Sequence, residues 1–185
     1  MASNPINPAY RKVEVDEFLD MELGDAKAEL VDGTIFMMSG GSEAHAAIAA
    51  NVIAALMPKL RGSGRRPYGS DMAVRTGLNS IRFPDVSIYC NTPRTPENAK
   101  SKLIGVPSVV FEVLSPSTAS NDQIAKLTEY RALDGLETIV FVDSDNERVR
   151  PVGKEGGDDW LPTGSDLEFA ALGITLSHDE IFAKD

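Results

Sequence analysis

The clearest periodicity in the chain lies between residues 43 and 60, where apolar side chains recur every four positions. This apolar series consists of Ile48, Val52, Leu56 and Leu60. Such spacing predicts an α-helix with one buried face, and the seven alanines in the same segment suit close packing against a sheet. His45 lies three residues before Ile48 and therefore shares the inward face, in the first turn of the helix.

Before this helix, two short apolar runs flank the dipeptide Asp32-Gly33. Asp-Gly between apolar runs is a strong signal for a tight turn, so residues 29–38 are predicted to form a β-hairpin. Upstream of the hairpin, residues 14–21 are predicted to form a short helix. The prolines and asparagines of residues 1–12 indicate a loose N-terminus.

Three successive strands are predicted at residues 65–74, 81–90 and 108–114. The third contains Val109-Val110-Phe111-Glu112-Val113-Leu114 and is nearly continuous in apolar residues. A run of this kind is typical of a strand that is buried on both faces, so we expect it at the centre of the sheet.

The remaining pattern begins with Ser120-Asn121-Asp122-Gln123, which matches an N-terminal capping box and predicts a helix from residue 120 to about 133. Residues 138–143 and 148–152 follow as a pair of strands joined by a turn. This order predicts an α/β fold with a mixed central sheet, helices on its faces and an N-terminal β-hairpin. The 185 residues suit one domain, 1–185.

Charge and composition narrow the class of protein. The chain contains 42% hydrophobic residues, enough for a substantial core, and its formal net charge is −10. An overall negative field opposes binding to nucleic acid, so any such binding requires a local basic surface. Candidates for that surface, each of which can alternatively be an ordinary solvated side chain, are Lys59, Arg61, Arg65, Arg66, Arg75, Arg82, Arg94, Lys100 and Lys102.

Targeting signals are not evident in the sequence. No stretch reaches the roughly 20 apolar residues of a membrane helix, and the N-terminus lacks the apolar core of a signal peptide, so a cytoplasmic location without a membrane partner is expected. The single cysteine, Cys90, excludes an internal disulfide and a cysteine-based zinc site. We expect Cys90 to serve as a small, buried apolar residue.

Two carboxylates occur where apolar side chains are expected. Glu112 shares its strand face with Val110 and Leu114, and Asp85 follows Pro84 in the middle of the predicted strand 81–90. A buried charge is costly unless it is paired, protonated or bound to metal. Two such acids on neighbouring strands favour a site for a divalent cation with oxygen ligands, and buried salt bridges with arginines are the alternative.

Lys126 is the candidate cation beside these acids. Asp122, Lys126 and Tyr130 are spaced four residues apart and therefore lie along one helical stripe. An ammonium group near a metal-bound water stabilises the hydroxide and the charge that develops on the attacked phosphate. The alternative is an ordinary exposed pair between Lys126 and Asp122.

Together these residues resemble the large bacterial restriction endonuclease family within the PD-(D/E)XK nuclease superfamily. The resemblance rests on Pro84-Asp85, on residues 109–118 around Glu112, and on Asp122, Lys126, Tyr130 and residues 135–137. It also covers residues 29–33 and His45, and it spans roughly residues 14–155.

The resemblance implies a restriction-endonuclease-like fold in which Asp85, Glu112 and the backbone carbonyl of Val113 bind Mg²⁺, with Mn²⁺ as a substitute. It implies further that Glu29 is an accessory acid near the metal and that His45 faces the same cleft. The superfamily lysine expected two residues after Glu112 is replaced by Leu114, and the resemblance moves this role to Lys126. The implied substrate is DNA, cut by a metal-activated water, and a homodimer is expected.

Two other classes of protein remain open at this stage. A catalytically inactive descendant of the same fold, acting as a binding or regulatory module, agrees with the charge of −10. An unrelated α/β protein with buried ion pairs needs arginine partners for both acids, and Arg82 is a candidate for one of them. His45 is either a proton acceptor for the attacking water or a core histidine.

Overall fold

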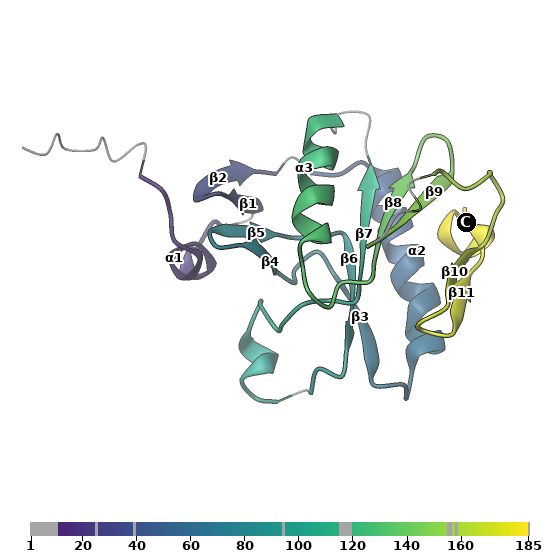
Figure 1. Ribbon diagram of the computed structural model, residues 1–185, viewed down its shortest axis with the longest axis horizontal. Coiled ribbons are helices and arrows are strands. Elements are labelled where there is room, and N and C mark those ends of the chain that lie inside the picture. Colours follow the sequence, from purple (N-terminus) through teal and green to yellow (C-terminus); the bar gives the residue numbers. More distant parts are fainter. Residues whose placement is uncertain are drawn as a thin grey trace, which may run out of the picture.

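The computed structural model describes residues 11–184, except residues 25, 39, 94, 115–119, 155, 156 and 158 and the side chains of residues 120–122. A five-stranded mixed sheet forms its centre (Figure 1). The strand order is β3 (Arg65–Gly69), β6 (Val86–Cys90), β7 (Val109–Leu114), β8 (Thr138–Asp143) and β9 (Arg148–Gly153). The predicted central position of β7 is confirmed.

One helix covers each face of this sheet. Helix α2 (Glu43–Leu60) has the predicted bounds, and its apolar series packs against one face. Helix α3 (Ser120–Arg131) connects β7 to the parallel strand β8 and lies on the other face (Figure 1). A helical crossover between parallel strands is the usual solution, because the chain must return to the same end of the sheet.

The alternation of side chains along β7 assigns its residues to the two helices. Phe111 and Val113 pack in the same core as Val52 of α2, whereas Val110 packs with Tyr130 of α3. Because side chains alternate along a strand, Glu112 faces α3 together with Val110. The sheet therefore presents a carboxylate to the inner surface of a helix.

A second, four-stranded antiparallel sheet lies beside the first (Figure 1). Its strand order is β2 (Thr34–Met37), β1 (Ala28–Val31), β5 (Ser80–Arg82) and β4 (Val74–Gly77). The predicted hairpin is confirmed as β1–β2: Asp32 and Gly33 have φ angles of 46° and 77°, as a type I′ turn requires. Helix α1 (Val15–Asp20) packs on this sheet through Val15 and Phe18.

Two segments that were each predicted to form one strand are divided between two strands. Residues 65–74 divide into β3 and the start of β4, and residues 81–90 divide into β5 and β6, so each prediction spans both sheets. The break before β6 falls at Pro84, which has no N–H for a strand ladder. Asp85 therefore lies at the junction of the two sheets and not in the middle of a strand.

The C-terminal part adds a small unit, of which the sequence pattern did not predict the two strands. Strands β10 (Leu167–Phe169) and β11 (Ile174–Leu176) form an antiparallel hairpin, and α4 (His178–Ile181) follows it. Their apolar residues join the core beside α2. Between β6 and β7, the chain carries the short 3₁₀ helix η2 (Asn98–Lys100). Within the described residues, no helix is long and apolar enough to cross a membrane.

Candidate active site

Glu112 is buried between β7 and α3, where two side chains of the helix bind it. Its Oε2 atom lies 2.8 Å from Nζ of Lys126, and its Oε1 atom accepts a hydrogen bond of 2.7 Å from the hydroxyl of Tyr130. The Glu112 and Lys126 side chains are only 7% and 11% exposed. The four-residue spacing of Lys126 and Tyr130 thus produces two contacts to one carboxylate. The alternative prediction, in which Lys126 is exposed, is wrong.

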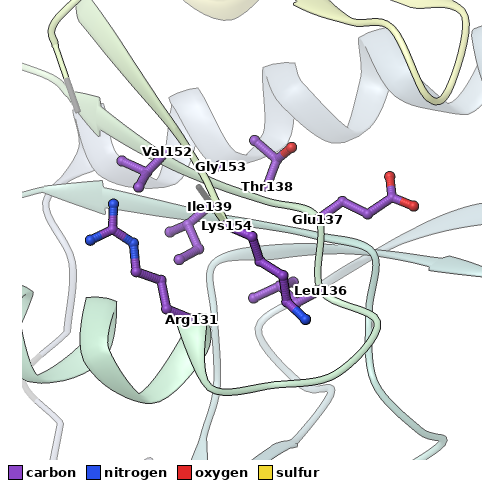
Figure 2. Close-up of a pocket in the computed structure, with 8 residues that line it drawn as sticks. All are labelled: Arg131, Leu136, Glu137, Thr138, Ile139, Val152, Gly153 and Lys154. Atoms are coloured by element: carbon purple, nitrogen blue, oxygen red, sulfur yellow. The ribbon is translucent and has the colours of Figure 1, made fainter. Parts of the chain in front are cut away.

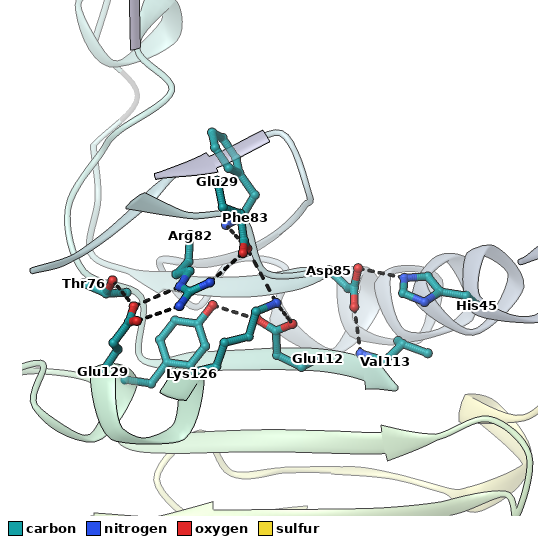
Figure 3. Close-up of polar contacts among 11 residues, drawn as sticks. Glu29, His45, Thr76, Arg82, Phe83, Asp85, Glu112, Val113, Lys126 and Glu129 are labelled. Carbon is teal, nitrogen blue, oxygen red and sulfur yellow. Dashed lines mark hydrogen bonds and ion pairs between the residues drawn. The ribbon is translucent and has the colours of Figure 1, made fainter. Parts of the chain in front are cut away.

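Glu29 reaches the same ammonium group from the second sheet. One of its carboxylate oxygens lies 3.5 Å from Nζ of Lys126, and the other accepts a 2.7 Å hydrogen bond from Arg82. Figure 3 shows Lys126 between the carboxylates of Glu29 and Glu112. Residues from β1, β7 and α3 therefore meet at one point, although they are far apart in the sequence.

Arg82 and Glu129 extend this network toward β4. Arg82 donates to both oxygens of Glu129 at 2.9 and 2.6 Å, and the hydroxyl of Thr76 donates to Glu129 at 2.6 Å. Glu129 was missed at the sequence level; its signal was its place one residue before Tyr130, beside the Lys126 stripe. Arg82 is almost completely buried, so its proposed place on a nucleic-acid surface is wrong.

Asp85 connects the first turn of α2 to the end of β7. Its Oδ1 atom lies 2.8 Å from Nε2 of His45, and its Oδ2 atom accepts a 2.7 Å hydrogen bond from the backbone N–H of Val113 (Figure 3). The N-cap of α2 positions His45, because the hydroxyl of Ser42 accepts a hydrogen bond of 3.2 Å from the backbone N–H of His45. The described partners of Asp85 and Glu112 are thus a histidine, a lysine, a tyrosine and a peptide group.

Burial, hydrogen bonds and neighbouring charges shift the pKa values of Glu112 and His45. Burial raises the pKa of Glu112 to about 7; Lys126 opposes this shift, and the charge of Asp85 adds to it. The hydrogen bond to Asp85 raises the pKa of His45 and outweighs the effect of partial burial. The His45 Nδ1 atom is buried without a hydrogen-bond partner. The site therefore contains a carboxylate that titrates near neutral pH and a histidine that keeps its proton to higher pH than an ordinary imidazole.

The five residues predicted for the site are brought into one region by the fold. Glu29 and Glu112 both contact Lys126, and Asp85 contacts His45 and the residue after Glu112. Within the described part of the chain, no three His, Cys, Asp or Glu residues are arranged as a preformed metal-binding group. A cation here would need backbone or water ligands besides the carboxylates.

The predicted basic surface is not a single patch. Lys59 pairs with Glu180, Arg65 donates to backbone carbonyls near the β10–β11 turn, and Arg75 donates to the carbonyl of Leu78. Arg94 lies outside the described residues. Arg61, Arg66, Lys100 and Lys102 remain exposed and have no ion pair among the residues that the structure describes.

A surface depression lies away from this cluster, between the end of α3 and the start of β8 (Figure 2). Arg131, Leu136 and Lys154 are among the residues that line it, and it offers no enclosed volume for a water molecule. Its lining includes no residue of the Glu112 cluster, by which we mean Glu29, His45, Asp85, Glu112, Lys126 and Tyr130. We assign no ligand to it.

Several known proteins are similar to this chain in sequence or in fold. The protein slr1290 of Synechocystis is 29% identical over 188 residues, which cover 98% of this chain and 97% of that protein. Another Synechocystis protein, sll1609, is 27% identical over 83% of this chain and 89% of its own length. A crystal structure titled "putative nuclease" from Anabaena variabilis has a TM-score of 0.78 at 17% identity and covers 92% of this chain and 98% of that one.

The structural likeness confirms the expected nuclease-type fold, since two chains at this TM-score share their arrangement of elements. The family described as "Putative restriction endonuclease" (Uma2) matches residues 15–181, nearly the whole chain. That match includes every residue of the cluster around Glu112 and Asp85. The chain therefore belongs to this restriction endonuclease family, and its function is of the nuclease type.

Proposed function

We propose that the protein is a Mg²⁺-dependent endonuclease that hydrolyses phosphodiester bonds of DNA by attack of an activated water. The observation that supports this most directly is that Asp85 and Glu112 meet at one peptide group, the one that joins Glu112 to Val113. Asp85 accepts from the N–H of Val113, and Glu112 is the residue before Val113. The two carboxylates therefore approach the same short stretch of β7.

The donor set suits a hard cation. Mg²⁺ prefers oxygen ligands and keeps several waters, so two carboxylates and one carbonyl are sufficient protein ligands. The N–H and the carbonyl of a strand residue point to the same side, so the carbonyl of Val113 is directed toward the side where Asp85 lies. Mn²⁺ accepts the same ligands. This set agrees with Asp85, Glu112 and Val113 as the metal-binding residues.

The metal, when bound, would supply a Lewis acid for the phosphate and lower the pKa of a bound water. Lys126 would hold Glu112 in its ionised form and place a positive charge beside the attacked phosphate. We assign it the role of the missing superfamily lysine because its Nζ atom already lies 2.8 Å from Glu112. The replacement of that lysine by Leu114 is thereby compensated by a residue from α3.

His45 and Glu29 would support these groups. The 2.8 Å contact with His45 orients Asp85, and the buried Nδ1 atom without a partner leaves His45 a second site for a proton. Glu29 holds Lys126 from the side opposite Glu112, and Arg82 neutralises Glu29. In this proposal, Glu29 is an accessory acid, and Arg82 and Glu129 are positioning residues.

A second function, a catalytically inactive binding module, is favoured by one specific observation. Each carboxylate oxygen of Asp85 and Glu112 already has a protein partner, so the cluster is stable without a cation. In an active nuclease, a metal ion must replace part of the contacts that the ammonium of Lys126 and the imidazole of His45 make with these carboxylates. In a binding module they would stay in place.

The deciding experiment combines metal titration with nicking of supercoiled plasmid. Isothermal titration of Mg²⁺ or Mn²⁺ into wild type should give a signal that Asp85→Asn and Glu112→Gln abolish, and only wild type should nick the plasmid. Glu137→Gln is the matched control, because Glu137 is an exposed acid outside the cluster. Equal nicking by wild type and Glu112→Gln would contradict the proposed mechanism. Light scattering on the same samples tests the proposed homodimer.

A further inference from the structure

A cavity of about 180 Å³ opens beside β3, the edge strand of the five-stranded sheet. The segment that carries η2 forms its outer wall, and we refer to it as the Tyr68 cavity. Its lining includes Arg66, Tyr68, Met72, Thr92, Asn98 and Ile104. It shares no lining residue with the Glu112 cluster, so the proposed chemistry does not use it.

The cavity opens on the same face of the sheet as Glu112. A side chain added at Gly69 would touch Ile53 of α2, so Gly69 points to the α2 face. Because side chains alternate along β3, Tyr68 and Arg66 point to the opposite face, which is the face that carries α3 and Glu112. The cavity and the cluster around Glu112 therefore lie on the same face of this sheet.

Three polar groups at the cavity are not satisfied by the protein. The guanidinium of Arg66 lies 5.7 Å from the centre of the Tyr68 ring and makes no hydrogen bond among the described residues. The Tyr68 hydroxyl also has no described partner. Asn98 uses its amide nitrogen to donate to the carbonyl of Pro93 at 2.8 Å, which leaves its oxygen available as an acceptor. The cavity thus combines a flat aromatic and guanidinium surface with an acceptor and two donors.

The size of the cavity selects the ligand class. Pockets for drug-sized ligands start at ~300 Å³, so 180 Å³ suits a fragment of one ring system. Planar bases stack on tyrosine rings and on arginine guanidinium groups, and their edges carry both donors and acceptors. Exposed Lys100 and Lys102 follow Asn98 within four residues and have no ion pairs among the described residues, so they are available to a phosphate.

We propose that the Tyr68 cavity binds a nucleobase, stacked against Tyr68 and Arg66, with its edge on Asn98. This inference rests on the proposed function, because it takes the base from the nucleic acid that the Glu112 cluster would cut. A base inside the cavity is unstacked from its neighbours, so the cavity selects single-stranded or locally opened nucleic acid. A free nucleotide carries the same chemistry, and the test separates the two sources.

The test measures binding by fluorescence anisotropy without divalent cations, so that no cleavage occurs. The probes are a short oligothymidine, a strand of the same length in which every base is removed, and thymidine monophosphate as a competitor. Wild type should bind the strand with bases more tightly than the abasic strand, by on the order of 10-fold for one stacked base. Effective competition by the monophosphate would support the cavity but assign it to free nucleotides.

Three variants connect this preference to the cavity. Arg66→Gln and Tyr68→Leu should bring the ratio between the two strands close to one; Arg66 is exposed, so its substitution cannot be confused with unfolding. Lys154→Gln is the matched loss of one charge beyond β9, at the opposite edge of the sheet, and should keep the ratio. An unchanged ratio in Arg66→Gln and Tyr68→Leu overturns the inference.

The remaining outcomes separate this inference from the proposed function. Equal binding of both strands by wild type overturns the cavity assignment and leaves the nuclease proposal standing. Failure of wild type to bind any of the probes also overturns the cavity assignment, and plasmid nicking in the presence of Mg²⁺ decides the nuclease proposal separately. If the ratio behaves as expected while Glu112→Gln nicks plasmid like wild type, the cavity stands and the proposed mechanism fails.

Discussion

Asp85 and Val113 are joined by a hydrogen bond of 2.7 Å from a backbone N–H to a carboxylate oxygen, across 28 positions of sequence. This bond continues the contact between β6 and β7 beyond the last paired residues, Val86 and Phe111. It fixes the carboxylate of Asp85 beside the residue that follows Glu112. The geometry of the proposed metal site therefore depends on this contact between a side chain and the backbone at the junction of the two sheets, together with the contact between Asp85 and His45.

The first prediction ranks the groups of the site by their effect on activity. Asp85→Asn and Glu112→Gln should abolish plasmid nicking, because each removes a proposed metal ligand. Lys126→Met should reduce the rate by on the order of 10²–10³ and leave residual activity, since it removes one stabilising charge. Initial rates in Mg²⁺ and in Mn²⁺ measure this order. A Lys126→Met variant as active as wild type would remove the lysine from the mechanism.

The second prediction concerns stabilisation by metal. A ligand that binds only the folded state at 100 times its Kd stabilises that state by ~2.7 kcal/mol, so Mn²⁺ should raise the Tm of wild type. Asp85→Asn should show no such rise, because a proposed ligand is missing. Thermal melting with and without the cation checks this, and Glu137→Gln serves as the control. An equal rise in wild type and Asp85→Asn would indicate binding elsewhere.

The third prediction is a pH dependence of stability. The pKa of Glu112 is raised from 4.5 to about 7 in the folded state, so the folded chain binds more protons than the unfolded chain between these values. The free energy of unfolding should therefore fall as pH rises from about 4.5 to about 7, by up to ~1.4 kcal/mol per pH unit for one proton. Urea unfolding at a series of pH values measures the slope.

The raised pKa of His45 acts in the same direction, so a comparison of variants is needed to isolate Glu112. Glu112→Gln removes one titrating group and should flatten the dependence between pH 5 and 7, while His45 still contributes. If the slope of Glu112→Gln equals that of wild type, the raised pKa does not belong to Glu112.

The fourth prediction concerns Arg82, whose side chain is 3% exposed and binds both Glu29 and Glu129. Removing one partner of a buried ion pair typically costs 3–5 kcal/mol, because the remaining charges stay buried without compensation; Arg82→Met should destabilise the fold by roughly this amount. Adding Glu129→Gln to Arg82→Met should recover part of the loss. Chemical denaturation of both variants measures the effect.

An exposed ion pair provides the comparison for this loss. Lys154 and Asp134 lie 3.3 Å apart, and both are well exposed. Lys154→Met should therefore change the free energy of unfolding by less than ~1 kcal/mol. An equally small effect of Arg82→Met would show that the buried network does not hold the second sheet against α3.

Local patterns in the sequence determined much of the secondary structure. The four-residue apolar spacing predicted the exact bounds of α2, and Asp32-Gly33 predicted the hairpin β1–β2. These elements depend on interactions between residues close in sequence, such as the N-cap at Ser42 and the positive φ of Gly33. The anomaly of Glu112 in an apolar strand also predicted that this carboxylate needs a charged partner or a metal.

Only the tertiary structure decided how the elements combine around that site. The division of residues 81–90 between two sheets depends on which strands lie alongside them. The sequence pattern carries no information about those neighbours and therefore predicted one strand. The pairing of Arg82 with Glu129, and of Asp85 with Val113, joins residues that no local spacing relates. A buried charge must find a partner, but chain folding chooses which one, because the partner need only be near in space.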